Sequence, residues 1–305
     1  MNDFTPLATT RQAAEILGVH ESSIKRWNTS KQLNAQQTSG GHRRFSITEI
    51  LDFAKKNRLD SPLLFYGSYA ERVWTGIEEL RKKNDYTILI QLVYEWILDD
   101  RTTFVSRLLI HVVRKEYPLE DVIDNLLAEV LYQVGENYMK GMLAIGDEHR
   151  ATHSLRDVLI HLKEQLRELG YARPARNRPI TILGCGREEK HELGALMARL
   201  VLEVQGWTVV YLGLDVPTEE FAKQQAQHEA ALVCISMMPP RGERDVHHIF
   251  NLLDRVYDRR HPYRLAFGGG AVSDIENFKV HGSIPEVRIF RTMKEFSYWI
   301  QKIAD

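Results

Sequence analysis

Five short apolar runs, separated by stretches with helical periodicity, occupy the carboxy-terminal part of the sequence. The runs are PITILGCG, WTVVYLG, AALVCISMM, YRLAFGGG and VRIF. Because strands that alternate with helices require crossover connections, this pattern predicts a doubly wound parallel sheet over residues 180–305. Ligands of such sheets bind at the carboxyl ends of the strands.

The middle of the sequence, residues 69–170, has helical periodicity throughout and predicts a bundle of about four helices. Two apolar stripes define its core. They are Leu119, Val122, Ile123, Leu126, Leu127, Val130, Leu131 and Val134, and Leu155, Val158, Leu159, Leu162, Leu166 and Leu169. The polar, basic segment 171–179 contains two prolines and predicts a linker.

Charge is distributed unevenly along the 305 residues. The whole chain has 40 Lys and Arg against 41 Asp and Glu, a net charge of −1, which taken alone disfavours a nucleic-acid-binding protein. Residues 1–59 carry nine basic and five acidic side chains, a balance of +4, which leaves −5 for the remainder. The amino-terminal end can therefore present a phosphate-binding surface.

The amino-terminal residues have the pattern of a helix-turn-helix followed by a hairpin. Thr9 or Thr10 is expected to cap a helix over 11–17, and Gly18 to turn the chain into a second helix over 20–27. Glycines at 40 and 41 mark a hairpin tip, and the S-x-x-E spacing of 46–49 predicts a capping box on a third helix.

The exposed residues of this region are candidates for DNA contact. The second helix offers Ser22, Ser23, Lys25 and Arg26 to a major groove. The hairpin offers His42, Arg43 and Arg44, with the arginines facing the DNA backbone or the adjoining minor groove.

The run AAEILGVHESSIKRW, followed by TSGGHRRF, resembles the winged helix-turn-helix of MerR-type transcriptional regulators over about the first 60 residues. His20 stands where that family commonly has a serine. Because histidine is a poorer helix cap, we expect a less firmly fixed helix start.

Three short motifs follow successive predicted strands. They are Glu189-x-His191-x-x-Gly194, Ser236-x-Met238 and Gly268-Gly269. Together they resemble the DxHxxG, SxL and GG signature of the cobalamin-binding, flavodoxin-like fold. That resemblance implies that His191 is the lower cobalt ligand, that Ser236 lies beside the nucleotide tail and that the glycines leave room for it. A carboxylate at Glu189 can orient the imidazole, although Glu189 replaces Asp and Met238 replaces Leu.

Other ligand classes are disfavoured at these strand ends. The segment after Gly184 lacks the third glycine of a dinucleotide-binding loop. Ser236 replaces the aspartate that a phosphoacceptor domain needs. The two cysteines, Cys185 and Cys234, form no CxxC pair, so a disulfide framework is excluded and a reduced cytoplasmic setting is expected. No signal-peptide pattern or apolar run long enough to span a membrane occurs.

The segment 138–149 resembles the W-x9-EH motif of the light-responsive CarH and LitR regulators, which have MerR-like, helical-cap and cobalamin domains in this order. The resemblance implies that Tyr138, Met139, Glu148 and His149 surround the upper ligand. Tyr138 replaces the tryptophan and Met139 a histidine that can ligate cobalt after photolysis. Thus a bis-histidine photoproduct is not expected. A different interpretation of Glu148 is that an acidic residue at a helix start favours the helix dipole.

We therefore predict a cobalamin-binding transcriptional regulator that is not an enzyme. Its domains are a winged helix-turn-helix over 1–60, a helical cap over 69–170, the linker 171–179 and a sheet domain over 180–305. We expect a light-responsive repressor that binds a double-stranded DNA operator and adenosylcobalamin, with methylcobalamin or hydroxocobalamin as alternatives. We also expect a homo-oligomer, either a dimer or a tetramer. The alternatives are a corrinoid methyltransferase or mutase component, and a regulator whose cobalamin sensing is lost or altered.

Overall fold

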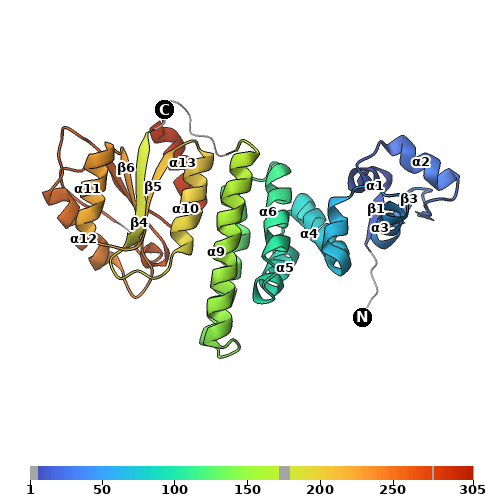
Figure 1. The fold of residues 1–305 in the computed structure, drawn as a ribbon, viewed down its shortest axis with the longest axis horizontal. Coiled ribbons are helices and arrows are strands. Elements are labelled where there is room, and N and C mark those ends of the chain that lie inside the picture. The colour runs from blue at the N-terminus through green and yellow to red at the C-terminus, as the bar shows by residue number, and fades with distance from the viewer. Residues whose placement is uncertain (1–5, 172–178, 277, 305) are drawn as a thin grey trace. The chain divides into compact units, whose positions relative to one another are not determined.

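The computed structural model describes residues 6–171, 179–276 and 278–304 (Figure 1). The chain divides into two compact units, Met1–Val93 and Tyr94–Asp305. The division falls inside one helix, α5 (Thr87–Leu98). The predicted linker at 171–179 lies almost entirely outside the described residues. The predicted division of the chain into three domains therefore stays a prediction.

The first unit begins with a small helix-turn-helix fold. Its elements are β1 (Leu7–Thr9), α1 (Thr10–Leu17), α2 (Glu21–Thr29), β2 (Gln36–Gln37), β3 (Arg43–Ser46) and α3 (Ile47–Lys56). The strands form an antiparallel sheet in the order β1-β3-β2. A 3-10 segment, η1 (Pro62–Tyr69), and α4 (Ala70–Lys83) follow.

Helix caps set the starts of these helices. Thr9 and Gln12 form a capping box on α1, and Gly18 ends that helix with φ 63°. His20 does cap α2, because its Nδ1 accepts a hydrogen bond from the backbone N–H of Ser22 (3.2 Å). The capping box predicted at 46–49 is wrong. Ser46 makes no side-chain cap bond, and Glu49 instead accepts a hydrogen bond from Asn34 Nδ2 (2.7 Å).

Helices make up the first part of the second unit. They are the end of α5, then α6 (Thr102–Arg114), α7 (Leu119–Val122), the π-helical turn η2 (Ile123–Leu127), α8 (Ala128–Met139) and α9 (Ile145–Glu168). Both predicted apolar stripes are buried except at Leu131 and Leu169. A π-helical turn inside a helix often marks a functional site, and here it brings Ile123 and Asp124 to a cavity.

The predicted parallel sheet is confirmed, with strand order β5-β4-β6-β7-β8. The strands are β4 (Ile180–Gly186), β5 (Thr208–Val216), β6 (Leu232–Ser236), β7 (Arg264–Gly268) and β8 (Val287–Phe290). Numbered within the domain, this is the 2-1-3-4-5 order of flavodoxin-like folds. Residues Val233, Ile235, Leu265 and Phe267 are part of its buried core.

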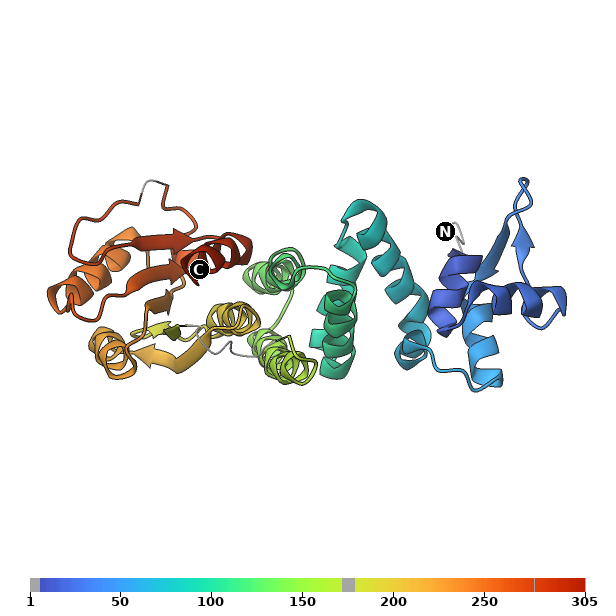
Figure 2. The same ribbon diagram turned by 90° about the horizontal axis from the view of Figure 1, so that it is seen from above.

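Helices cover both faces of this sheet. They are α10 (Leu193–Val204), α11 (Thr218–His228), α12 (Glu243–Arg255) and α13 (Met293–Ala304). Figure 2 shows α10 and α13 on one face and α11 and α12 on the other. Helix α9 packs against α10, so the helical part of the unit lies over the α10–α13 face. No helix among the described residues has the length and apolar character needed to cross a membrane.

Candidate functional site

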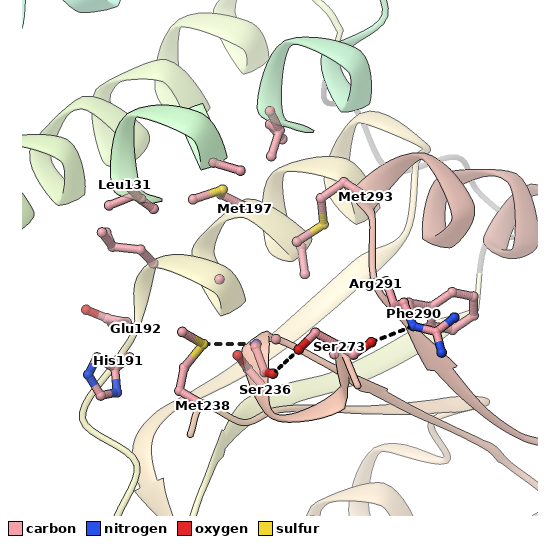
Figure 3. Close-up of a pocket in the computed structure, with 18 of the residues that line it drawn as sticks. Leu131, His191, Glu192, Met197, Ser236, Met238, Ser273, Phe290, Arg291 and Met293 are labelled. Carbon is pink, nitrogen blue, oxygen red and sulfur yellow. Dashed lines mark hydrogen bonds between the residues drawn. The ribbon is translucent and has the colours of Figure 1, made fainter. Parts of the chain in front are cut away.

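A cavity of about 470 Å³ lies between the helical part of the second unit and the carboxyl ends of the parallel strands. Its sheet-side lining includes His191, Gly194, Ser236, Met238, Gly268 and Gly269. Figure 3 shows His191 at one end of the cavity and Arg291 at the other, with Ser236 and Met238 between them. The register explains why the motifs meet, because Ser236 pairs with Gly268 across neighbouring strands.

Glu189 is the most connected side chain of the site. Its side chain is 1% exposed. Oε1 accepts hydrogen bonds from the backbone N–H groups of Lys190 and His191 (both 3.0 Å) and lies 2.5 Å from His191 Nδ1. Oε2 accepts from the N–H of Met238 (2.7 Å) and from Arg241 Nη1 (3.1 Å). The carboxylate therefore joins the loop after β4 to the loop after β6.

The pKa of Glu189 follows from these contacts. Burial alone would raise it, but the hydrogen bonds from His191 and Met238 outweigh burial, so the pKa of Glu189 lies below the ordinary glutamate value. The group is therefore an anion over the physiological pH range. An anionic acceptor 2.5 Å from Nδ1 favours the His191 tautomer with its proton on that nitrogen.

His191 is presented to the cavity with one nitrogen available. Its side chain is 65% exposed, and no described residue hydrogen-bonds its Nε2. The Cys185 thiol donates to the His191 carbonyl oxygen (Sγ–O 3.6 Å), and burial raises the pKa of Cys185 to about 12. This thiol stays protonated and helps to hold the loop. A neutral imidazole fixed through Nδ1 is a good ligand for a transition metal through Nε2.

Glycines allow the strand-end loops to approach closely. Gly269 has φ +100°, and a Cβ there would overlap the carbonyl oxygen of Met237. A Cβ on Gly194 would lie 3.3 Å from Ser236 Oγ. Met238 packs against Gly270, and its Sδ accepts a hydrogen bond from the N–H of Gly270 (3.1 Å). The sheet side of the cavity is thus built from glycines, Ser236 and Met238.

On the helical side of the cavity, the structure brings together only part of the predicted set. Met139 and Glu148 line the cavity, whereas Tyr138 and His149 do not. Tyr138 is 41% exposed, so it does not continue the buried stripe. At the start of α9, Asp147 accepts a hydrogen bond from the Ala144 N–H (3.3 Å), and the next residue, Glu148, lines the cavity.

Sequence reasoning missed several lining residues on this side, including Leu131, Tyr132, Gly135 and Thr152. Thr152 Oγ1 donates to Glu148 Oε1 (3.1 Å). The i, i+4 spacing of Glu148 and Thr152 was the available signal, since residues four apart share a helix face.

Two polar contacts flank the cavity and join the helices to the sheet domain. Asp124 of η2 accepts hydrogen bonds from the N–H groups of Met293 (2.8 Å) and Lys294 (2.9 Å) at the start of α13. Arg156 Nε of α9 donates to Glu192 (2.7 Å), which also accepts from the Tyr211 hydroxyl (3.0 Å). No sequence motif marks either contact, because the partners are distant along the chain.

The candidate DNA-contact residues lie on α2 and on the hairpin of the first unit. Ser22, Lys25, Arg26 and His42 are exposed, and Ser23, Arg43 and Arg44 are half-buried. Arg44 donates to the carbonyl oxygen of Arg43 (3.2 Å). Their role in DNA binding stays a prediction.

The sequence matches models of known domain families over three ranges. Residues 9–58 match a helix-turn-helix domain, and residues 89–163 and 179–282 each match a B12 binding domain. The chain is also 26% identical over 272 residues to the HTH-type transcriptional repressor CarH of Myxococcus xanthus, which covers 85% of this chain and 87% of that protein. The chain thus has a helix-turn-helix domain and B12 binding domains, and it is similar to CarH over most of its length. These matches support a cobalamin-binding transcriptional regulator.

The fold of this chain also resembles that of a solved structure. The monomethylamine corrinoid protein of Methanosarcina barkeri aligns with a TM-score of 0.53 at 17% identity, over 69% of this chain and 96% of that one. At this level of identity the likeness concerns the fold alone. It agrees with the helical cap and five-stranded parallel sheet described above.

The residues present fit a corrinoid. The donor set offers one imidazole with a free Nε2 and an anionic partner on Nδ1, and the glycine-lined strand ends leave open space beside it. No group of three or more His, Cys, Asp or Glu that could hold a bare metal ion occurs within the described ranges. A single nitrogen donor suits a cobalt ion that would take most of its other ligands from a macrocycle.

Proposed function

We propose that this chain is a transcriptional repressor that binds adenosylcobalamin through His191 and an operator through its helix-turn-helix. The observation that carries the proposal is the Glu189–His191 pair, which presents a free Nε2 to the cavity. When bound, adenosylcobalamin supplies a cobalt–carbon bond that light breaks. Methylcobalamin and hydroxocobalamin are alternative forms.

The two sides of the cavity would contact different parts of the cofactor. On the sheet side, His191 would bind the cobalt. The space for the remainder of the cofactor would lie beside Ser236, Met238, Gly194, Gly268 and Gly269. On the helical side, Met139 and Glu148 would meet the upper ligand, because both line the cavity. Tyr138 and His149 stay part of the proposed upper pocket only if the helices move when the cofactor binds.

Regulation would act through avidity, that is, through the number of helix-turn-helix domains that bind one operator together. One small helix-turn-helix makes few phosphate and base contacts, whereas several held in a dimer or tetramer bind one operator together. We propose that the upper-ligand state alters the packing of the helical cap on the sheet domain and thereby assembly. The basic amino-terminal end supports a DNA partner rather than an enzymatic role, since a corrinoid enzyme component would leave residues 1–60 without a task.

Absorption spectra test this proposal. The wild-type protein is mixed with adenosylcobalamin in the dark, freed of unbound cofactor, and recorded before and after green light. We expect the wild type to retain a histidine-ligated corrinoid and His191→Ala to lose that ligation. His153→Ala, which changes an exposed histidine of α9 that does not line the cavity, is the matched control. Identical spectra from wild type and His191→Ala would refute the ligand assignment.

DNA binding and assembly are measured on the same samples. We expect dark, loaded protein to be oligomeric by light scattering and to retard its promoter DNA, and illuminated protein to lose both. Lys25→Ala with Arg26→Ala should abolish retardation without changing the spectrum, because these side chains belong to the other unit. If light changes the spectrum but neither assembly nor retardation, the chain binds cobalamin without being a light-responsive repressor.

A further inference from the structure

Arg241 belongs to none of the three strand-end motifs, yet its guanidinium contacts the carboxylate of Glu189, the partner of His191. It follows β6 after Pro239 and Pro240 and is 20% exposed. Nη1 donates to Glu189 Oε2 (3.1 Å), and Nη2 donates to the carbonyl oxygen of Arg187 (2.5 Å). One planar group therefore ties the Glu189 carboxylate to the loop that carries His191.

The His191 ring depends on such a tie because its own packing cannot hold it. With 65% of the side chain exposed, few neighbours restrict rotation of the imidazole. The hydrogen bond from Nδ1 to Glu189 is the contact that sets ring orientation and tautomer. Any freedom of the Glu189 carboxylate is therefore passed on to the ring.

The carboxylate is in turn fixed at both oxygens. Oε1 has three N–H donors from the loop itself, whereas the donors to Oε2 among the described residues are the Met238 N–H and Arg241. The terminal torsion of a glutamate is broad, so a second donor on Oε2 is needed to define it. Within the described part of the chain, Ser236 makes no side-chain hydrogen bond to Glu189, and Arg241 occupies the far end of the carboxylate.

Charge gives a second reason for an arginine at this position. The Glu189 side chain is 1% exposed, and a buried carboxylate is costly unless it is paired with a cation and fully hydrogen-bonded. His191 is neutral when it serves as a metal ligand, so it cannot be that cation. A guanidinium is always charged and can bind two acceptors in one plane.

We propose that Arg241 is a positioning residue for His191, acting through Glu189 to hold the imidazole in the Nδ1-protonated tautomer. The proposal rests on the proposed function only in that His191 serves as the cobalt ligand. It has a part that needs no cofactor, because the tautomer exists in the free protein.

The variants are Arg241→Met, Arg241→Lys and a control, Arg244→Met. Methionine keeps the length but removes the charge and both donors. Lysine keeps the charge but not the planar fork. Arg244 lies on the exposed side of α12 and controls for loss of one cation near the site.

The first measurement is nitrogen NMR of the free protein at about pH 8, above the ordinary histidine pKa of about 6.5. We expect wild type and Arg244→Met to show one His191 tautomer, Arg241→Met a mixture, and Arg241→Lys an intermediate result. A single unchanged tautomer in folded Arg241→Met overturns the proposal. If that variant does not fold, Arg241→Lys is decisive, and a spectrum equal to wild type overturns the role of the fork.

The second measurement is the electron paramagnetic resonance spectrum of cob(II)alamin bound to protein labelled with nitrogen-15 histidine. The cofactor's own nitrogen base splits each cobalt line into three, whereas a labelled histidine ligand splits it into two. We expect Arg241→Met to retain the corrinoid about tenfold less well, with partial loss of the splitting by histidine, as for other residues that orient a metal ligand. Full splitting by histidine in Arg241→Met overturns the proposal. Absence of splitting by histidine in the wild type instead refutes His191 as ligand, while the NMR result still decides the role of Arg241.

Discussion

At the residue scale, Gly269 combines two constraints, a positive φ and a close backbone approach, of which Gly213 on β5 has only the first. Gly269 and Gly213 both have positive φ, +100° and +84°, but only at Gly269 would a Cβ strike backbone. We expect Gly213→Ala to lower the free energy of unfolding by about 1–2 kcal/mol, the cost of a left-handed alanine. Gly269→Ala should cost about 1–3 kcal/mol more, because overpacking is added. Urea denaturation of both variants measures the difference.

Equal losses in these two variants would contradict the overlap with Met237. The comparison also shows what sequence reveals at this scale. The glycine pair and His191 were predictable because parallel strands bring their carboxyl ends to one edge. Arg241 and Asp124 were not, since their partners are set by loop paths and helix docking that no periodicity encodes. The place of Tyr138 outside the cavity depends on where α8 ends, and helix ends are hard to predict.

At the element scale, Asp124 links the helical cap to α13 and makes that contact sensitive to pH. Burial raises the pKa of Asp124 above the ordinary aspartate value, and the N–H groups of Met293 and Lys294 lower it only in part. Folded protein therefore binds the proton more tightly than unfolded protein. The contribution of Asp124 to the free energy of unfolding is fully present below its pKa in the unfolded chain, about 3.9. It is lost as the pH rises through the higher pKa of Asp124 in the folded protein.

Asp124→Asn isolates this contribution because it keeps an acceptor for α13 but cannot ionise. We expect the free energy of unfolding of wild type, relative to Asp124→Asn, to fall as pH is raised from about 4 toward 7. Denaturant titrations at several pH values measure it, with Asp157→Asn, an exposed acid of α9, as control. A difference that stays constant or rises with pH would contradict the raised pKa.

The elements themselves were largely predictable. The five strands and the helical stripes can be predicted from the pattern of apolar residues, because the buried positions of a strand or helix recur with the period of that element. The capping box at Ser46 failed because Glu49 has a competing donor in Asn34, which is distant in sequence. A helix cap depends on very few hydrogen bonds, so one tertiary contact is enough to draw a capping side chain to another partner.

At the scale of the whole molecule, a buried polar pair assigns α4 to the first unit. Gln12, the partner of Thr9 in the capping box of α1, donates through Nε2 to Glu78 of α4, and both side chains are buried. Removing Glu78 leaves the Gln12 amide without its acceptor, which costs about 1–3 kcal/mol. Because Gln12 and Glu78 both lie within Met1–Val93, the loss belongs to that unit.

Calorimetry can therefore assign each unfolding transition to one of the two units, because one change destabilises the first unit and another stabilises the second. We expect two unfolding transitions, of which Glu78→Ala lowers one and adenosylcobalamin raises the other. Cofactor at a hundredfold excess over its Kd stabilises the unit that binds it by about 2.7 kcal/mol. Since α5 runs through the boundary between Val93 and Tyr94, two separate transitions require this helix to unwind at the boundary when one unit unfolds. A single transition shifted by both perturbations would mean that α5 joins the two units into one cooperative structure, so that a change in the second unit is transmitted to the helix-turn-helix.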